Sequence, residues 1–227
     1  MTEHVRIENN GGILTLTLAR PDKKNALTDA MYGKLADTIE AAETDSSVRV
    51  LLIRGEGDMF TAGNDVGEFA AVQGRAVGVG TTMLLHCDLV VLADNAQLST
   101  PFVSLALVPE AASSLLMPAR IGYARAYEMF ALGETVPARS ALEWGLANRV
   151  VPLDKLDAEA LALAQRLARQ PAGALTATKK LMRNGEALVA QMQAEGEQFA
   201  QRLRTAEARE AFTAFAERRP PDFTKVA

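Results

Sequence analysis

Alternating apolar and polar positions at the start of the chain predict a β-hairpin. Within residues 13–18, leucine stands at every second position with threonine in between, a pattern typical of a strand with one buried face. Asn10, Gly11 and Gly12 separate this strand from a first one at residues 5–9, and such a turn favours a hairpin. We therefore expect two antiparallel strands at the start of the chain.

A helical period follows the hairpin. Thr28 is a suitable N-cap for a helix, and apolar side chains recur after it at helical spacing, on Met31, Leu35, Ile39 and Ala42. Residues 48–53 then form an apolar run that predicts a buried strand. Strand patterns at residues 89–92, 96–99 and 145–151 alternate with helix patterns at residues 123–132 and 138–144. The alternation predicts an α/β core.

The pattern changes in the last third of the chain. From Leu156 onward it is helical, rich in alanine and leucine and without strand signals. We therefore divide the chain into a core over residues 1–151 and a helical region over residues 152–227. Amphipathic runs in the helical region, such as residues 161–167 and 208–215, favour a subunit interface over a membrane-binding surface, because their charge is balanced.

Composition narrows the classes of function. A content of 48% hydrophobic and 23% charged residues describes an ordinary globular protein, and a net charge of -4 without a basic stripe gives no indication of nucleic acid binding. The single cysteine, Cys87, rules out an internal disulfide and suits a reducing compartment. The sequence shows neither a signal peptide nor an apolar run of membrane-spanning length, so we expect a cytoplasmic protein.

A glycine-rich stretch at residues 74–88 is the first sign of chemistry. Gly74, Gly78 and Gly80 precede a run that is compatible with a helix. The first N–H groups of a helix have no partner within it, and the helix dipole there favours negative charge. Such a place can bind an anion or stabilise an oxyanion that forms during a reaction. Taken alone, the pattern is more often a plain turn.

Two segments taken together resemble the signature of the crotonase (enoyl-CoA hydratase/isomerase) superfamily. They are residues 60–66, Phe-Thr-Ala-Gly-Asn-Asp-Val, and residues 74–80, Gly-Arg-Ala-Val-Gly-Val-Gly. The Arg-Pro pair at 20–21 with Asn-Ala-Leu at 25–27, and residues 145–151 late in the core, match the same superfamily. The resemblance covers nearly the whole chain.

The resemblance implies a fold, a substrate class and an assembly. It implies an α/β, crotonase-like spiral of ββα turns over residues 1–151, followed by a C-terminal α-helical trimerisation region over residues 152–227. The partners would be an acyl-CoA thioester substrate and two further copies of the chain, in a homotrimer or a hexamer made of two trimers. Coenzyme A would be part of the substrate, and no cofactor, metal, nucleic acid or membrane is expected.

The resemblance assigns an oxyanion hole to the backbone N–H groups of Asn64 and Val79. Because the donors belong to the backbone, valine in place of the commoner glycine is tolerable, and the position of Val79 just before a helix suits developing negative charge. Lys24 could contact a CoA phosphate, although a solvated loop lysine is more common. The residues that would line the substrate path are Lys24, Ala26, Ala62, Asp65, Val66, Thr82, Pro101, Phe102, Leu105 and Pro109.

Two glutamates that hydratases of this superfamily use are absent. The matching positions hold Thr82 and Phe102, the second of which directly follows Pro101. Neither side chain can act as a general acid or base at neutral pH, so ordinary hydratase chemistry is in doubt.

Glu110 is a different candidate for the catalytic base. Residues 109–114, Pro-Glu-Ala-Ala-Ser-Ser, resemble the Pro-Glu-Gly-x-Ser-Ser segment of peroxisomal-type Δ3,Δ2-enoyl-CoA isomerases, in which the glutamate moves a proton from C2 to C4. The alternative is an exposed glutamate that caps a helix beginning at Ala111. An apolar pocket strengthens a carboxylate as a base, and the apolar residues expected around Glu110 are Phe102, Leu105, Leu107 and Val108.

Three functions remain open at this point. The leading hypothesis is a Δ3,Δ2-enoyl-CoA isomerase with Glu110 as its base. A hydratase-like or otherwise diverged crotonase that uses Glu110 with water is the alternative among enzymes. An acyl-CoA-binding trimer without catalytic activity is the alternative from another class.

One departure from the superfamily pattern is large. In the superfamily, a helix and a strand normally separate the segment at Asn64 and Asp65 from the segment at residues 71–74, whereas only residues 66–70 stand between them here. The difference amounts to roughly 30 residues, judged from ordinary helix, strand and loop lengths. We expect the loss of a whole strand to open the core of the spiral, and our hypothesis is that the natural chain contains the segment.

Overall fold

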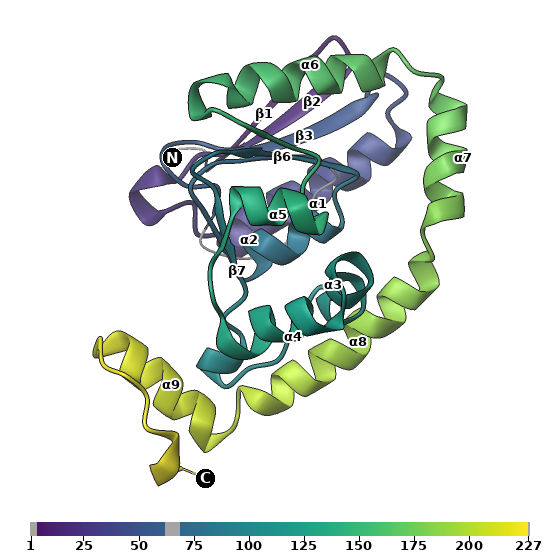
Figure 1. Cartoon of the computed structure of the whole chain (residues 1–227). Coiled ribbons are helices and arrows are strands. Elements are labelled where there is room, and N and C mark those ends of the chain that lie inside the picture. Colours follow the sequence, from purple (N-terminus) through teal and green to yellow (C-terminus); the bar gives the residue numbers. More distant parts are fainter. Residues whose placement is uncertain (1–3, 62–68, 227) are drawn as a thin grey trace.

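The structure is a computed structural model that describes residues 4–61 and 69–226. Helices and strands alternate through the first two thirds, and helices follow (Figure 1). The strands are β1 (Val5–Asn10), β2 (Ile13–Leu18), β3 (Val50–Gly55), β4 (Phe69–Val72), β5 (Arg75–Val77), β6 (Leu89–Ala93), β7 (Gln97–Ser99), β8 (Val136–Pro137) and β9 (Arg149–Val151). The helices are α1 (Asp29–Thr44), α2 (Val79–Thr82), α3 (Ser113–Ile121), α4 (Tyr123–Leu132), α5 (Ala138–Trp144), α6 (Leu156–Ala168), α7 (Ala172–Met182), α8 (Gly185–Arg202) and α9 (Ala206–Ala216).

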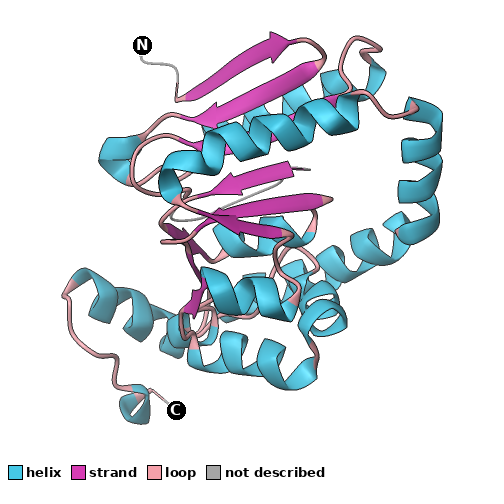
Figure 2. Ribbon diagram, turned by 45° about the horizontal axis from the view of Figure 1, so that its top comes forward, coloured by secondary structure: helices cyan, strands magenta, loops and turns pink. Residues whose placement is uncertain are grey.

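The larger sheet has the strand order β1-β2-β3-β4-β6-β9. β1 and β2 are antiparallel, as the hairpin pattern predicts, and every later neighbour in this sheet pairs in parallel. A smaller sheet joins β5, β7 and β8. Figure 2 shows the strands of the larger sheet side by side, with helices on both faces.

Burial on the two faces of the larger sheet follows the sequence pattern. Leu14, Leu16 and Leu18 on β2 point into one core, together with Met31 and Leu35 of α1. The hydroxyl of Thr28 accepts a hydrogen bond from the Met31 N–H at 3.3 Å, so the predicted N-cap of α1 is confirmed. The opposite face of the sheet packs against α6 through a separate apolar cluster.

The expectation that a whole strand is missing is wrong. The short β4 occupies the place between β3 and β6, with Ala70 paired to Ile53 on one side and to Val90 on the other. Between β3 and β4, the described residues 56–61 contain no helix. The larger sheet is therefore continuous, although the connection spans only residues 56–68, close to the minimum for a parallel crossover.

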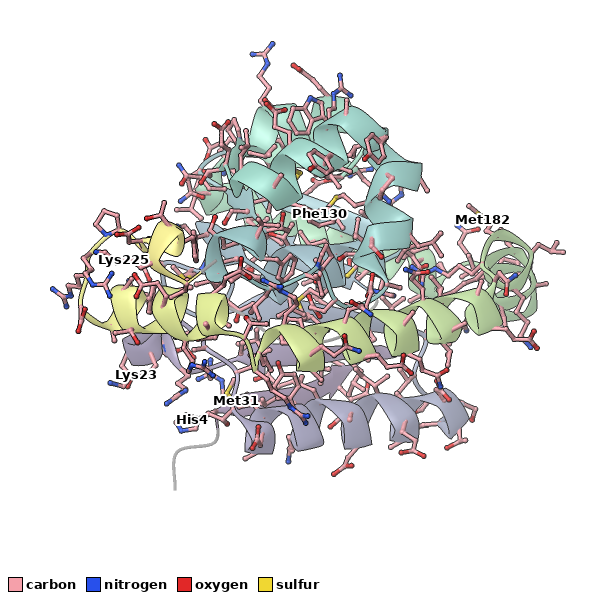
Figure 3. The ribbon with its side chains drawn as sticks, turned by 90° about the horizontal axis from the view of Figure 1, so that it is seen from below. His4, Lys23, Met31, Phe130, Met182 and Lys225 are labelled. Carbon is pink, nitrogen blue, oxygen red and sulfur yellow. The ribbon has the colours of Figure 1, made fainter. Side chains whose placement is uncertain are left out.

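The C-terminal helices form an arc around the core. α6 packs on the larger sheet, and α7 and α8 then pass along the outside to reach α3, with α9 near the C-terminus (Figure 1). Seen from below, α8 crosses the molecule between α1, which carries Met31, and the region of α3 and α4, which carries Phe130 (Figure 3). Within the described part of the chain, no helix is both long and apolar enough to cross a bilayer.

Candidate active site

The structure places the start of the first signature segment, residues 60–61, next to the second signature segment. The Phe60 N–H donates to the Gln73 carbonyl at 2.9 Å, and the Val77 N–H donates to the Thr61 carbonyl at 3.3 Å. Thr61 also forms a parallel bridge with Ala76. Residues 60–61 therefore run alongside residues 73–77, and the place where they meet leads directly into α2.

Two glycines in the second segment allow this close approach. Gly74 has a φ of 58°, and a Cβ on it would lie 2.0 Å from the Asp58 carbonyl oxygen. A Cβ on Gly80 would lie 2.9 Å from both the carbonyl oxygen and the Cγ2 of Thr61. Neither position has room for a larger residue, so the glycine stretch is more than a plain turn.

Val79 is the first residue of α2, in the place expected for an oxyanion donor. Gly78 precedes it with a φ of 59°, and the Gly78 carbonyl accepts hydrogen bonds from the N–H groups of Thr81 and Thr82. Among the described residues, no hydrogen bond uses the Val79 N–H. Asn64, the other expected donor, lies outside the described residues, as do Ala62, Asp65 and Val66.

Thr82 and Glu110 are in direct contact. The Thr82 hydroxyl donates to the Glu110 Oε1 at 2.6 Å, across 28 residues of sequence. Thr82 stands three residues after Val79, so it shares a face of α2 with the candidate oxyanion donor. Thr82, at the position that matches a hydratase glutamate, thus carries a hydroxyl that holds the carboxylate of Glu110 beside α2.

Glu110 also lines a cavity of about 310 Å³ between α1 and α8. Its other walls are mostly apolar, and they come from Tyr32, Met192, Gly196, Phe199, Ala200 and Leu203. The sequence predicts Glu110 but places its apolar surroundings in residues 102–108, whereas the apolar residues that line this cavity come mostly from α8. Phe102 instead packs in the core against Phe130, with ring centroids 6.2 Å apart.

The remaining described residues that were predicted to bind substrate lie in two segments, one just before Glu110 and one near the start of the chain. Pro101, Leu105 and Pro109 are half-buried in the segment from β7 to Glu110. The exposed Lys24 side chain pairs with Asp58 at 2.8 Å, and the half-buried Ala26 accepts a hydrogen bond from Arg20 through its carbonyl. Lys24 is therefore a paired surface lysine in this structure.

Asn25 connects the first signature segment to the start of the chain. The amide NH₂ of its buried side chain donates to the backbone carbonyls of Glu56 and Met59, both at 2.8 Å. The backbone carbonyl of Asn25 accepts a hydrogen bond from the Thr61 hydroxyl at 2.7 Å. In the sequence, Asn25 is only a supporting match to the superfamily pattern, and its spacing gives no sign of these contacts. Its φ of 52°, which asparagine tolerates better than most residues, places the side chain for these contacts.

Two arginines hold the end of the helical element that starts at Val79. α2 continues into a 3₁₀ turn at Met83–Leu85, whose carbonyls accept hydrogen bonds from Arg120 and Arg183. Burial, together with the nearby Arg183 charge, lowers the pKa of Arg120. These contacts satisfy carbonyls at the end of the element and fix its direction.

The loop after Glu110 has an unusual backbone. Ala111 and Ala112 have φ values of 57° and 54°, in the left-handed region where glycine is favoured. α3 begins at Ser113, two residues later than the helix start considered at Ala111. Glu110 is half-buried and accepts from Thr82, so it is not the exposed helix cap of the alternative interpretation.

Replacing Ala111 with glycine is expected to stabilise the protein. The left-handed conformation costs a non-glycine residue about 1–2 kcal/mol, and the greater chain entropy of glycine offsets part of the gain, so we expect about 0.5–1 kcal/mol. Urea denaturation measures the change. Ala162→Gly, in an exposed interior position of α6, is the matched control and should destabilise by about 1 kcal/mol. Destabilisation by both substitutions would contradict the claim that the left-handed backbone at Ala111 costs free energy.

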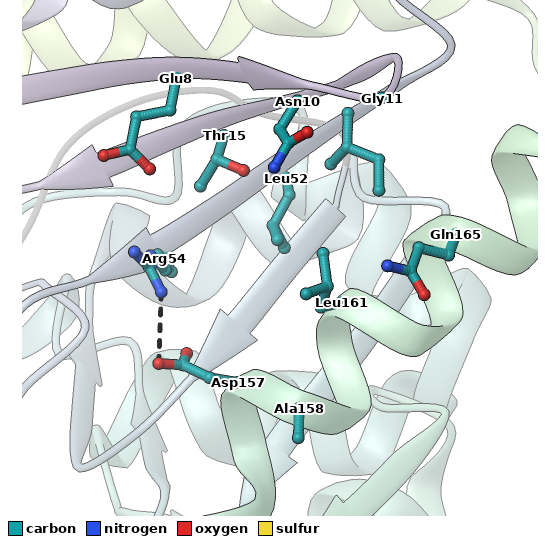
Figure 4. A pocket seen from close by; sticks show the side chains of 11 residues that line it. Glu8, Asn10, Gly11, Thr15, Leu52, Arg54, Asp157, Ala158, Leu161 and Gln165 are labelled. Atoms are coloured by element: carbon teal, nitrogen blue, oxygen red, sulfur yellow. Dashed lines mark hydrogen bonds and ion pairs between the residues drawn. The ribbon is translucent and has the colours of Figure 1, made fainter.

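A larger cavity, of about 460 Å³, lies on the opposite face of the sheet (Figure 4). It is bounded by the hairpin, β3 and α6, and an ion pair between Arg54 and Asp157 crosses its edge at 3.2 Å. Its lining includes none of the candidate catalytic or substrate-binding residues predicted from the sequence. Within residues 4–61 and 69–226, no group of three or more His, Cys, Asp or Glu side chains could hold a metal ion.

The arrangement is suited to proton transfer next to a carbonyl group. A backbone N–H at a helix start can stabilise negative charge on the carbonyl oxygen, and a carboxylate in a mostly apolar cavity can remove and return a proton. One acid–base group is sufficient for moving a proton between two carbons. Adding water across a double bond requires a water site in addition.

Comparisons with known proteins agree with the signature segments. The chain matches the family described as enoyl-CoA hydratase/isomerase over residues 8–71 and 69–226. It is 32% identical to the 1,2-epoxyphenylacetyl-CoA isomerase of Escherichia coli (strain K12) over 260 aligned positions that cover 99% of both chains. It is 33% identical to the 2,3-dehydroadipyl-CoA hydratase of the same organism, over 93% of this chain and 94% of the relative. A crystal structure of an enoyl-CoA hydratase/isomerase from Pseudoalteromonas atlantica T6c shares 39% identity and a TM-score of 0.93, over 97% of this chain and 100% of that chain.

The comparisons also locate the short connection. The family match is in two pieces, residues 8–71 and residues 69–226, which overlap at residues 69–71 within β4. The alignment with the isomerase spans 260 positions, more than the 227 residues of this chain, so that relative has residues without a counterpart here. Whether the natural chain contains a further segment stays a hypothesis.

Proposed function

The chain belongs to the enoyl-CoA hydratase/isomerase family of the crotonase superfamily, and we propose that it shifts the double bond of a 3-enoyl-CoA to the 2-position. The observation that carries this proposal is the position of Glu110, whose carboxylate accepts a hydrogen bond at 2.6 Å from the hydroxyl of Thr82, three residues after Val79 in α2. The two positions that carry glutamates in hydratases of the superfamily hold Thr82 and Phe102 here, so Glu110 is the proposed acid–base group. Isomerisation requires only one.

The proposed reaction passes through a dienolate. The Glu110 carboxylate removes a proton from C2, and negative charge develops on the thioester oxygen, which accepts hydrogen bonds from the N–H groups of Val79 and, by family match, Asn64. The protonated Glu110 then returns the proton to C4. The acyl chain would extend into the cavity between α1 and α8, whose mostly apolar lining suits a hydrocarbon.

Hydration is the second candidate. It is favoured by the hydratase among the relatives, which is as similar to this chain as the isomerase. In that case Glu110 would activate water, and Thr82 would orient it.

Neither of the two candidate reactions needs a cofactor other than the coenzyme A that forms part of the substrate.

We also propose that the active form is a homotrimer, alone or paired into a hexamer, in the cytoplasm. Large apolar side chains lie exposed on the C-terminal helices in the single chain, which supports burial against another copy. They are Leu181, Met182, Val189, Phe212 and Phe215.

Two separate assays of the purified protein test the proposed function. With a 3-enoyl-CoA, we expect the ultraviolet absorbance of the conjugated 2-enoyl thioester to appear. With a 2-enoyl-CoA, we expect no 3-hydroxyacyl product. Hydration of the 2-enoyl-CoA without conversion of the 3-enoyl-CoA would replace the proposal with the hydratase. Inactivity toward both, with retained binding of acyl-CoA, would favour the non-catalytic trimer.

A further inference from the structure

Glu195 is a buried glutamate on α8, with only 5% of its surface exposed. Its carboxylate accepts hydrogen bonds from the N–H groups of Ala112 at 2.6 Å and Ser114 at 2.9 Å, and from the Ser114 hydroxyl. A carboxylate with three donors at the start of a helix is both hydrogen-bonded and favourably placed in the helix dipole. Glu195 therefore caps α3 from a distant part of the chain.

The cap is needed because α3 has none of its own. Its N-cap residue, Ala112, offers no side-chain acceptor, and its left-handed backbone turns the chain sharply out of the Glu110 loop. Gln191, one turn earlier on α8, donates to the Ser114 hydroxyl at 2.8 Å and orients it. Two residues of α8 thus hold the first turn of α3.

The same loop is held on its other side by the helical element of the oxyanion donor. The His86 Nε2 lies 2.7 Å from the Ala111 carbonyl, and Thr82 donates to Glu110. The Ser113 N–H donates to the Glu110 carbonyl at 3.0 Å, which closes the loop on itself. Glu110 therefore lies in a short loop whose backbone is fixed at Ala111 from one side and at Ala112 from the other.

α8 also contributes to the cavity that Glu110 faces. Gly196, directly after Glu195, lines that cavity together with Met192, Phe199 and Ala200. One helix therefore provides a wall of the acyl site and the acceptor that fixes the catalytic loop. We infer that Glu195 is a positioning residue, which sets the place of the Glu110 carboxylate through the backbone of residues 110–114; this inference rests on the proposed role of Glu110.

A merely structural cap and a positioning residue predict different kinetics. Loss of a cap lowers stability but leaves the turnover of folded molecules unchanged. Loss of a positioning residue lowers turnover while substrate binding is kept, because misplacement by a fraction of an ångström affects the transition state more than the ground state. The separation of turnover from binding is the decisive measurement.

Glu195→Gln in the full-length chain tests the inference. Glutamine keeps the shape but replaces one acceptor oxygen with an NH₂ group that faces the N–H donors of α3. We expect kcat with a 3-enoyl-CoA to fall roughly 10- to 100-fold, by analogy with losses of supporting contacts at other sites. The Kd of saturated hexanoyl-CoA should stay within threefold. Glu197→Gln, at an exposed position two residues further on α8, is the matched control and should behave as wild type.

Two further variants keep the test decisive. Ser114→Ala removes one contact of Glu195 and retains both N–H bonds, so it should fold and lose less turnover than Glu195→Gln. Adding Glu195→Gln to Glu110→Gln should cause no further loss, since Glu195 acts through Glu110. Additive losses, a parallel change of kcat and Kd, or wild-type turnover of Glu195→Gln would each overturn the inference. Wild-type turnover of Glu110→Gln alone would instead overturn the proposed function.

Discussion

Glu110→Gln is expected to lower kcat with a 3-enoyl-CoA by about 10³-fold or more, near the upper range for loss of a general acid–base group. Glutamine can still accept the hydrogen bond from Thr82, so the loop should keep its structure while the group that carries the proton is lost. Steady-state kinetics give kcat, and titration with hexanoyl-CoA gives Kd, which should change little.

A matched control separates this effect from a general loss of charge. Glu134→Gln changes an exposed glutamate next to the end of α4, away from the cavity, and should leave kcat unchanged. A fall of less than threefold for Glu110→Gln would show that another group carries the proton. A large fall in isomerisation together with retained hydration would assign separate groups to the two reactions.

Val79→Pro is expected to lower kcat by about 10²- to 10³-fold, the usual cost of removing one oxyanion donor. Proline lacks the backbone N–H but fits the first position of a helix, where that group has no partner within the helix. Gly78 before it has a φ of 59° and a ψ of -121°, the mirror image of the extended conformation that precedes proline, and glycine can adopt it. The substitution therefore removes the donor and leaves α2 able to form.

Val79→Ala is the control, because it changes the side chain and keeps the N–H. We expect its kcat to stay within a few-fold of wild type, and circular dichroism to show folded protein for both variants. Equal losses for alanine and proline would indicate that the buried valine side chain matters and the backbone donor does not. Unchanged turnover in Val79→Pro would remove Val79 from the oxyanion hole.

Local patterns predicted the elements that depend on local physics. The alternating leucines of β2, the Thr28 cap and the apolar stripe of α1 each depend on residues a few positions apart. β4 was missed because Phe69–Val72 is too short to show a period, and its partners on both sides supply the pairing. A four-residue strand is stable there because the sheet around it is already specified.

The candidate site also contains residues that the sequence predicts and contacts that only the tertiary structure shows. The family resemblance assigned Glu110, and the structure adds the contact with Thr82 that no spacing rule shows. Glu195 was missed because its partner Ser114 lies 81 residues away in the sequence. One signal was present: Leu188, Met192 and Phe199 form an apolar stripe on α8, and Glu195 lies on it. A carboxylate on the buried side of a helix needs a donor, and that need points to a tertiary contact.

The short crossover into β4 has a consequence for how this architecture can change. β4 keeps its register through its pairing with β3 and β6, so the length of the preceding connection does not determine where the strand lies. The part of that connection that follows the proposed donor Asn64 can therefore be lengthened while the sheet and the start of α2 stay in place. Long surface insertions cost little free energy of loop closure, about 0.6 kcal/mol for each doubling of length. Inserting residues between 66 and 69, after the proposed donor Asn64, would be a practical way to redesign access to the proposed acyl site.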